Sequence, residues 1–298
     1  MADLGLYPST NTIQLGFQPT NHARATSNLK QVVGHVVEKQ HPTCTQLNMS
    51  QIQEKKDQLR QEWIELSSAW IKEAREGRNP TRNGLLDQPM LEACGNVEGL
   101  QILDCGCGEG RFCRILAQRG ASYVLGLDLC QPMIQAAREL QSNCNEYRVA
   151  DVQNLSFLLD QSFDLVVSYL NQCDLPDFMA NTREVYRLLR SKGQFIIANL
   201  HPMMSAEGRW CKTENGIKKH VVLDQYFEEN ERHWKMMGVN FTNFHRTLST
   251  YIQGFMEVGF KIEGIIEPTI SKDQLVLYPE LEDELRVPNF IIYSLSKP

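Results

Sequence analysis

Apolar residues recur along the chain with two different spacings, and the change from one to the other divides the sequence. Between residues 50 and 77 they recur at helical spacing, which predicts one amphipathic helix with Ser50 as its cap and Gly77 at its end. The apolar stripe of this helix contains Leu59, Trp63, Leu66, Trp70 and Ile71. The segment NPTRNG then breaks the pattern, and residues 85–94 (LLDQPMLEAC) predict a second, shorter helix.

From residue 100 onward, short apolar runs alternate with amphipathic segments. The apolar runs predict strands at residues 100–105, 122–129, 145–152, 163–170 and 194–200. The amphipathic segments predict helices at residues 110–120, 131–142 and 178–193, the last one closed by Gly193. Because strands and helices alternate at this spacing, the sequence predicts an α/β fold in which a parallel sheet is covered by helices on both faces.

The regular alternation stops after residue 200. Two strand-like runs, VVLDQYF and HWKMMGVNF, follow among irregular segments. Later segments predict a helix at residues 247–259 and strands at residues 260–268 and 289–298. The insertion over about residues 201–245 therefore interrupts the α/β scaffold, and insertions of this kind usually build a substrate site.

The domain organisation is predicted from where the periodic pattern is absent and where it is present. Residues 1–48 are polar and lack sustained periodicity, which predicts a flexible N-terminal arm. We expect lid helices over residues 49–95 and one main domain over residues 96–298, which carries the insertion.

Composition narrows the classes of partner and compartment. The formal net charge of -6 argues against a nucleic-acid partner, because binding to phosphates relies on Lys and Arg. No apolar run is long enough to predict a membrane span, and the N-terminus lacks the pattern of a secretory signal. Nine cysteines, an odd number, are expected to be reduced thiols of a cytoplasmic protein. The oligomeric state stays open.

A glycine-rich loop follows the first predicted strand of the main domain. In LDCGCGEG, three alternate glycines, Gly106, Gly108 and Gly110, connect a strand to a helix and let a ligand approach the backbone closely. The loop is one residue tighter than the dinucleotide pattern G-x-G-x-x-G. Asp104 precedes it, and a carboxylate there can bind an ammonium group but would repel a pyrophosphate.

Two further acids end the next two predicted strands. Asp128 can accept hydrogen bonds from both hydroxyls of a ribose. Asp151 can accept a hydrogen bond from the exocyclic amine of an adenine, and the backbone N–H of Val152 lies nearby in the sequence. The sequence therefore offers partners for an ammonium, a ribose and an adenine in order, and S-adenosylmethionine (SAM) contains all three.

With these motifs, the chain resembles the class I SAM-dependent methyltransferases between Leu100 and Leu200. The segment HRTLSTYIQGFMEVGFKIEGIIEP is further similar to small-molecule members from quinone and secondary-metabolite pathways. The resemblance implies a Rossmann-like, seven-stranded and mostly parallel sheet with helices on both faces and an antiparallel last strand. It also implies SAM as the cofactor, and it assigns Asp104 and the three glycines to the methionine part. Tyr169 would lie near the methyl group, and the remaining cofactor contacts would come from Asp128, Leu129, Asp151 and Val152.

The methyl acceptor is predicted from the segments around this core. A hydroxyl acceptor needs a base, whereas a carboxylate needs mainly positioning. His201, after the fifth strand, is the best-placed candidate base and His245 is the second. Alternatively, His201 could hold the loop that follows it, and His245 could make a hydrogen bond at a helix start. Trp210 and Tyr226 in the insertion, and Arg246 beside it, are candidates for binding the acceptor.

Positive charge in the insertion points to the class of acceptor. Arg209, Lys212, Lys218 and Lys219 favour an anionic acceptor, unless they are a solvated surface run. Arg82 could reach the methionine carboxylate of SAM. Trp63 and Trp70 could belong to a lid, with Trp70 touching the acceptor, or could pack plainly against the sheet.

The predicted function is O-methylation of a small molecule or short peptide. The sequence SYLNQCDLPDF stands where amine-methylating relatives carry N/D-P-P-Y/F, which disfavours nucleic-acid and protein-amide acceptors. Cys105, Cys107 and Cys113 lack the paired spacing of zinc sites, so we expect no metal. The alternatives are N- or C-methylation of a metabolite, a nicotinamide-dependent oxidoreductase, and a SAM-binding module without activity.

Overall fold

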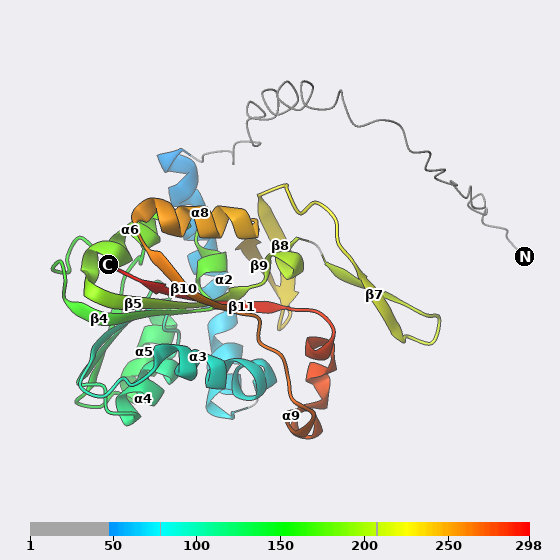
Figure 1. Ribbon diagram of the computed structural model, residues 1–298, viewed down its shortest axis with the longest axis horizontal. Coiled ribbons are helices and arrows are strands. Elements are labelled where there is room, and N and C mark those ends of the chain that lie inside the picture. The colour runs from blue at the N-terminus through cyan, green and yellow to red at the C-terminus, as the bar shows by residue number, and fades with distance from the viewer. Residues whose placement is uncertain (1–47, 78, 207) are drawn as a thin grey trace, which may run out of the picture. The chain divides into compact units, whose positions relative to one another are not determined.

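The fold is seen in a computed structural model that describes residues 48–77, 79–206 and 208–298 (Figure 1). The predicted N-terminal arm lies outside the described residues, apart from Asn48.

A seven-stranded sheet forms the centre of the main domain, in the spatial order β10-β11-β5-β4-β1-β2-β3. Strands β5, β4, β1, β2 and β3 run parallel to one another, whereas β11 is antiparallel to both β5 and β10. The predicted α/β sheet with an antiparallel last strand is therefore confirmed. The strands are β1 (Gln101–Cys105), β2 (Tyr123–Asp128), β3 (Asn145–Val149), β4 (Phe163–Tyr169), β5 (Leu189–Leu200), β10 (Lys261–Ile266) and β11 (Phe290–Ser296).

Successive residues of the strands point to opposite faces of this sheet, and each face has its own apolar core. Ile102 packs with α3 (Asp87–Cys94), α4 (Arg111–Gln118) and α5 (Gln131–Glu139) on one face. Leu103 packs with α6 (Phe178–Leu188) and α8 (Leu248–Val258) on the other. Figure 1 shows the two layers above and below the edge of the sheet. A sheet buried on both faces explains why the central strands read as continuous apolar runs.

The parallel register brings the ends of β1, β2, β3 and β4 to the same edge of the sheet. Asp104 pairs with Gly126 of β2 and with Val167 of β4, and Asp128 pairs with Val149 of β3. Side chains at or just beyond these strand ends therefore converge, as ligands of open α/β sheets require.

The predicted first helix is α2 (Met49–Arg75), but its cap differs from the prediction. Asn48, not Ser50, accepts the backbone N–H of Gln51, and the Gln51 side chain accepts the N–H of Asn48 in return. This reciprocal capping box satisfies two N–H groups at once, which a serine inside the first turn cannot do. The segment predicted as a break instead contains a π-helical turn, η1 (Thr81–Leu86), which leads directly into α3.

Two boundaries differ from the sequence predictions. Helix α6 ends at Leu188, and Gly193 lies within β5 rather than at a helix end, because the strand begins with an irregular register against β4. The insertion holds two hairpins where two single strands were expected, because Met237 and Gly238, both with positive φ, turn the chain inside HWKMMGVNF. The hairpin strands are β6 (Arg209–Lys212), β7 (Lys218–Val222), β8 (Glu231–Met236) and β9 (Val239–Phe244).

Short helices complete the described fold. They are the 3₁₀ turns η2 (Gln172–Asp174) and η3 (Pro279–Leu285) and the helices α7 (Pro202–Ser205) and α9 (Lys272–Leu277). Among the described helices, none combines the length and the apolar character that a membrane crossing requires.

Candidate active site

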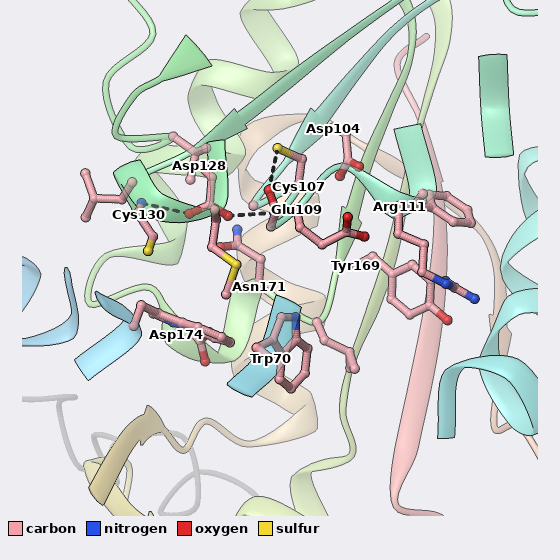
Figure 2. A pocket seen from close by; sticks show the side chains of 18 of the residues that line it. Trp70, Asp104, Cys107, Glu109, Arg111, Asp128, Cys130, Tyr169, Asn171 and Asp174 are labelled. Carbon is pink, nitrogen blue, oxygen red and sulfur yellow. Dashed lines mark hydrogen bonds between the residues drawn. The ribbon is translucent and has the colours of Figure 1, made fainter. Parts of the chain in front are cut away.

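A crevice lies at the edge of the sheet where β1, β2 and β4 end, and its empty space, open solvent included, is about 1220 Å³. One wall consists of the glycine loop and the segments that follow these strands. The other wall is one face of α2, together with η1. Figure 2 shows side chains from both walls pointing into this space.

The three predicted glycines take the turn that the backbone needs, each with a positive φ. A Cβ atom on Gly106 would lie 2.4 Å from the side chain of Asn171, and one on Gly110 would lie 2.6 Å from the ring of Tyr147. A Cβ on Gly108 would meet nothing within 4 Å. The first and third glycines thus allow close packing within the protein, whereas Gly108 leaves its space to a ligand.

Asp104 lies at the base of this loop and is 1% exposed. Its Oδ2 accepts a hydrogen bond from Cys113 Sγ at 3.1 Å, while its buried Oδ1 has no hydrogen-bond partner among the described residues. Burial raises the pKa of Asp104 to about 7, and the nearby Arg82 partly opposes this rise. A buried carboxylate oxygen without a donor suits a cationic ligand group, which would supply the missing hydrogen bond.

Asp128 is held by backbone amides at the end of β2. Its Oδ2 accepts the N–H of Gly108 and its Oδ1 accepts the N–H of Cys130, both at 2.8 Å (Figure 2). Burial raises its pKa, and these backbone hydrogen bonds act against the rise. The carboxylate lines the crevice, as does the neighbouring Leu129, in a fixed orientation with lone pairs left for a ligand's hydroxyls.

Asp151 and Val152 also line the crevice, but the structure adds a partner that the sequence did not reveal. Lys56 of α2 donates to Asp151 Oδ2 at 2.7 Å. The Oδ1 atom accepts from the backbone and side chain of Gln153. The residue predicted to bind adenine therefore also ties the helical wall to the sheet edge.

Arg82 enters the crevice between two aromatic rings. Its guanidinium carbon lies 5.1 Å from the ring centre of Trp70 and 4.8 Å from that of Tyr169. It forms no ion pair in the described part of the chain, and burial lowers its pKa. Tyr169 in turn donates to Asp87 Oδ1 at 2.9 Å. A half-buried cation of this kind can bind a carboxylate, so Arg82 and Asp104 together fit the two charged groups of an amino acid.

The residue that sequence reasoning missed is Asp174, at the end of η2. It is 8% exposed, lines the crevice, and accepts from Asn243 Nδ2 at 2.5 Å. Burial raises its pKa to about 7. Its position just past the fourth strand, in SYLNQCDLPDF, was the signal that could have drawn attention to it.

The two candidate histidines lie outside the crevice. His201 Nδ1 accepts the N–H of Met203, and its Nε2 lies 3.0 Å from Glu267 Oε1. His245 has Ser205 Oγ at 2.7 Å from Nδ1 and the carbonyl oxygen of Tyr226 at 2.9 Å from Nε2. Burial lowers the pKa of each imidazole. Both rings thus make hydrogen bonds that hold neighbouring segments together. This was the alternative for His201, whereas the alternative for His245 was a hydrogen bond at a helix start.

Of the four predicted acceptor-binding residues, the structure places one in the crevice and three outside it. Trp70 lines the crevice. Trp210 instead packs under Arg286, and the hydroxyl of Tyr226 accepts the N–H of Leu248. Arg246 is buried next to the crevice wall, where it donates to the carbonyl oxygens of Leu175 and Pro176, two residues that line the crevice. These last three residues are not brought into the crevice.

The chain is similar to known proteins over the same region. Residues 103–197 match the family described as a methyltransferase domain. The crystal structure of an S-adenosylmethionine dependent methyltransferase from Mesorhizobium loti superposes with a TM-score of 0.63 at 34% identity, covering 70% of this chain and 95% of that one.

Two curated relatives match more narrowly. A malonyl-[acyl-carrier protein] O-methyltransferase from Hamiltonella defensa is 34% identical over 47% of this chain and 53% of its own length. A ubiquinone biosynthesis O-methyltransferase from Pseudomonas fluorescens is 29% identical over 41% of this chain and 52% of its own length. The chain therefore spans about half the length of these two relatives.

Proposed function

The chain belongs to the class I SAM-dependent methyltransferases, and from that premise we propose that it methylates a hydroxyl oxygen of a small, largely apolar acceptor. The observation that carries the proposal is the composition of the crevice. Its cofactor end offers buried charged groups in need of partners, and the space beside it is lined by aromatic and aliphatic side chains together with one carboxyl group.

The cofactor end is assigned to named residues. Asp104 Oδ1 would bind the ammonium of the methionine part and Arg82 its carboxylate. Asp128 would hold the ribose, while Asp151 and Val152 would face the adenine. When bound there, SAM supplies a methyl carbon on a positively charged sulfur, which an acceptor oxygen can attack. The protein contributes alignment and the exclusion of water.

The other end of the crevice has an apolar wall. One face of α2 and the segment after η2 supply Leu59, Trp63, Trp70, Leu175 and Pro176. Aromatic and aliphatic linings with few polar groups are typical of sites for small organic molecules. A small acceptor with an apolar ring system would fill this space.

The charges of the crevice favour a hydroxyl over a carboxylate as the acceptor. Among the described cations that line it, Lys56 pairs with Asp151, Arg60 with Asp57 and Arg111 with Asp87. Arg82 is assigned to the cofactor. The basic residues of the insertion lie outside the crevice, and Lys218 forms an ion pair with Asp283. An anionic acceptor would therefore find little charge to offset its desolvation.

The names of the two curated relatives are consistent with oxygen as the acceptor atom. Both are O-methyltransferases, on different acceptors. Their shared chemistry supports O-methylation here, and the crevice of this chain selects the kind of oxygen.

The test begins with calorimetry of SAM and S-adenosylhomocysteine and continues with three matched acceptors: naphthol, naphthoate and naphthylmethylamine. Mass spectrometry of reactions with methyl-deuterated SAM would identify the product. We expect both nucleosides to bind and naphthol to become its methyl ether. Methylation of naphthoate or naphthylmethylamine alone, or of none of the three, would overturn the hydroxyl assignment.

A further inference from the structure

We propose that Asp174 is the catalytic base, which takes the proton from the acceptor hydroxyl, and that Asn243 positions it. This inference rests on the proposed function and deepens it. It joins two segments that are far apart in the sequence: η2 after the fourth strand and β9 of the insertion.

The geometry places a buried carboxyl at the acceptor end of the crevice. Asp174 Oδ1 accepts from Asn243 Nδ2 at 2.5 Å and from Cys173 Sγ at 3.4 Å. Trp63 of α2 lines the same crevice. In the view of Figure 2, Asp174 and Trp70 lie in the lower half and Asp104 lies in the upper half. Two donors, one from β9 and one from η2, thus fix a side chain that lines the crevice.

The other aspartates that line the crevice in the described part of the chain have different tasks. Asp104 lies under the glycine loop, at the ammonium position. Asp128 receives a backbone amide on each oxygen, and Asp151 pairs with Lys56. Asp174 alone of these four stands beside the apolar wall with only uncharged hydrogen-bond donors.

The surroundings of Asp174 tune it for proton transfer near neutral pH. Burial raises its pKa to about 7, hydrogen bonds from Cys173 and Asn243 lower it, and the charge of Asp128 raises it. Lys56 and Arg60 of α2 also line the crevice, each with a carboxylate partner. A general base is most efficient when its pKa lies near the working pH.

The step balances in atoms and charge. The hydroxyl proton moves to the Asp174 carboxylate while the acceptor oxygen forms a bond to the methyl carbon. The bond between that carbon and sulfur breaks, and its electron pair stays on sulfur. The products are a methyl ether, S-adenosylhomocysteine and a neutral Asp174, which afterwards releases its proton to water.

The first experiment compares Asp174→Asn with Asp160→Asn on naphthol and SAM. The amide keeps the shape but cannot take the proton, so we expect kcat to fall by roughly 100- to 10,000-fold. SAM affinity should change by less than about threefold, because Asp104 and Asp128 are intact. Asp160, whose side chain is 68% exposed in an ion pair with Arg187, supplies the matched control and should keep wild-type kcat. Circular dichroism melts would identify a folding defect.

The second experiment tests positioning through the pH profile of kcat with both substrates saturating. Saturation matters because Asp104, which also titrates near neutral pH when empty, is then paired with the cofactor. In wild type, kcat should rise as Asp174 ionises. Asn243→Ala removes a hydrogen bond that lowers the pKa, so the rise should shift to higher pH, with about tenfold loss at neutral pH and recovery above it. Asp174→Asn should abolish the rise.

The outcomes separate this inference from the proposed function. If wild type methylates naphthol and folded Asp174→Asn retains its kcat, the base assignment is overturned while the function stands. An unshifted profile in folded Asn243→Ala would overturn the positioning role. If wild type binds SAM but methylates no hydroxyl, the proposed function fails and the inference fails with it.

Discussion

The two walls of the crevice are built by different kinds of contact. The sheet-edge wall is fixed by backbone groups: Gly106 and Cys107 donate N–H groups to the carbonyl of Leu127, and Gly108 donates to Asp128. The α2 wall is attached through side chains, with Lys56 on Asp151 and Glu62 accepting from the N–H and hydroxyl of Thr242. A sheet with paired strands holds its shape at rest, whereas partly exposed ion pairs contribute at most about 1 kcal/mol each.

This difference suggests a division of labour. We expect the sheet edge to give the cofactor a preformed site, because its oxygens and glycines are set by the strands themselves. We expect the α2 wall, which carries Trp63 and Trp70, to open and close over the acceptor at small energetic cost. Four variants or conditions, taken from the largest expected effect to the smallest, test whether the two walls differ in this way.

The largest effect is expected for Asp104→Asn in the sheet-edge wall. The ammonium of SAM would lose a buried ionic partner, which costs about 3 kcal/mol, or roughly a 100-fold loss of affinity. Isothermal titration calorimetry measures it. Asp128→Asn is the companion variant: its loss should be smaller, because the amide oxygen can still accept one hydroxyl. Wild-type affinity in Asp104→Asn would place the ammonium elsewhere.

Gly108→Ala probes the space that the sheet-edge wall leaves to the ligand. The added methyl group meets no protein atom within 4 Å, so it should obstruct SAM by about 2 kcal/mol, or roughly 30-fold, while the protein stays folded. Gly99→Ala is a matched control, because Gly99 also has a positive φ and open space but lies outside the crevice. Equal SAM affinities for the two variants would show that the ligand avoids Gly108.

The affinity for SAM should also depend on pH through Asp104. In the empty protein burial raises its pKa to about 7, and the bound ammonium favours the ionised form. Affinity should therefore fall as the pH drops through about 7, by about tenfold between pH 8 and pH 6. Calorimetry at several pH values checks this. The slope should vanish in Asp104→Asn, and a slope that persists there would belong to another group.

The sheet-edge wall is also the part of the crevice that the sequence predicts well. Asp104, the three glycines, Asp128 and Asp151 lie in one stretch where each strand is followed by its own helix, so local pattern alone places them at one edge. Nothing comparable specifies the other wall. Lys56 meets Asp151 over 95 residues, and Asn243 meets Asp174 over 69, and such pairs depend on how distant elements pack.

His201 illustrates the same limit at a single position. The sequence places it correctly after β5, at the edge where ligands bind. Its ring is nevertheless used locally, because Nδ1 accepts the N–H of Met203 at the start of α7 and Nε2 meets Glu267. The sequence predicts that a residue lies at the end of a strand. The direction of its side chain depends on which neighbouring groups need a hydrogen-bond partner, and the sequence does not show this.

The smallest effect is expected for Lys56→Met in the α2 wall. The substitution keeps the apolar stem and removes the ion pair with Asp151, which costs at most about 1 kcal/mol. Amide hydrogen exchange in the first half of α2 should accelerate up to about fivefold, while exchange in β1 stays unchanged. Lys72→Met, at an exposed site in the last turn of the same helix, is the matched control. Unchanged exchange in Lys56→Met would mean that buried Leu59 and Leu66 hold α2, and that both walls are fixed.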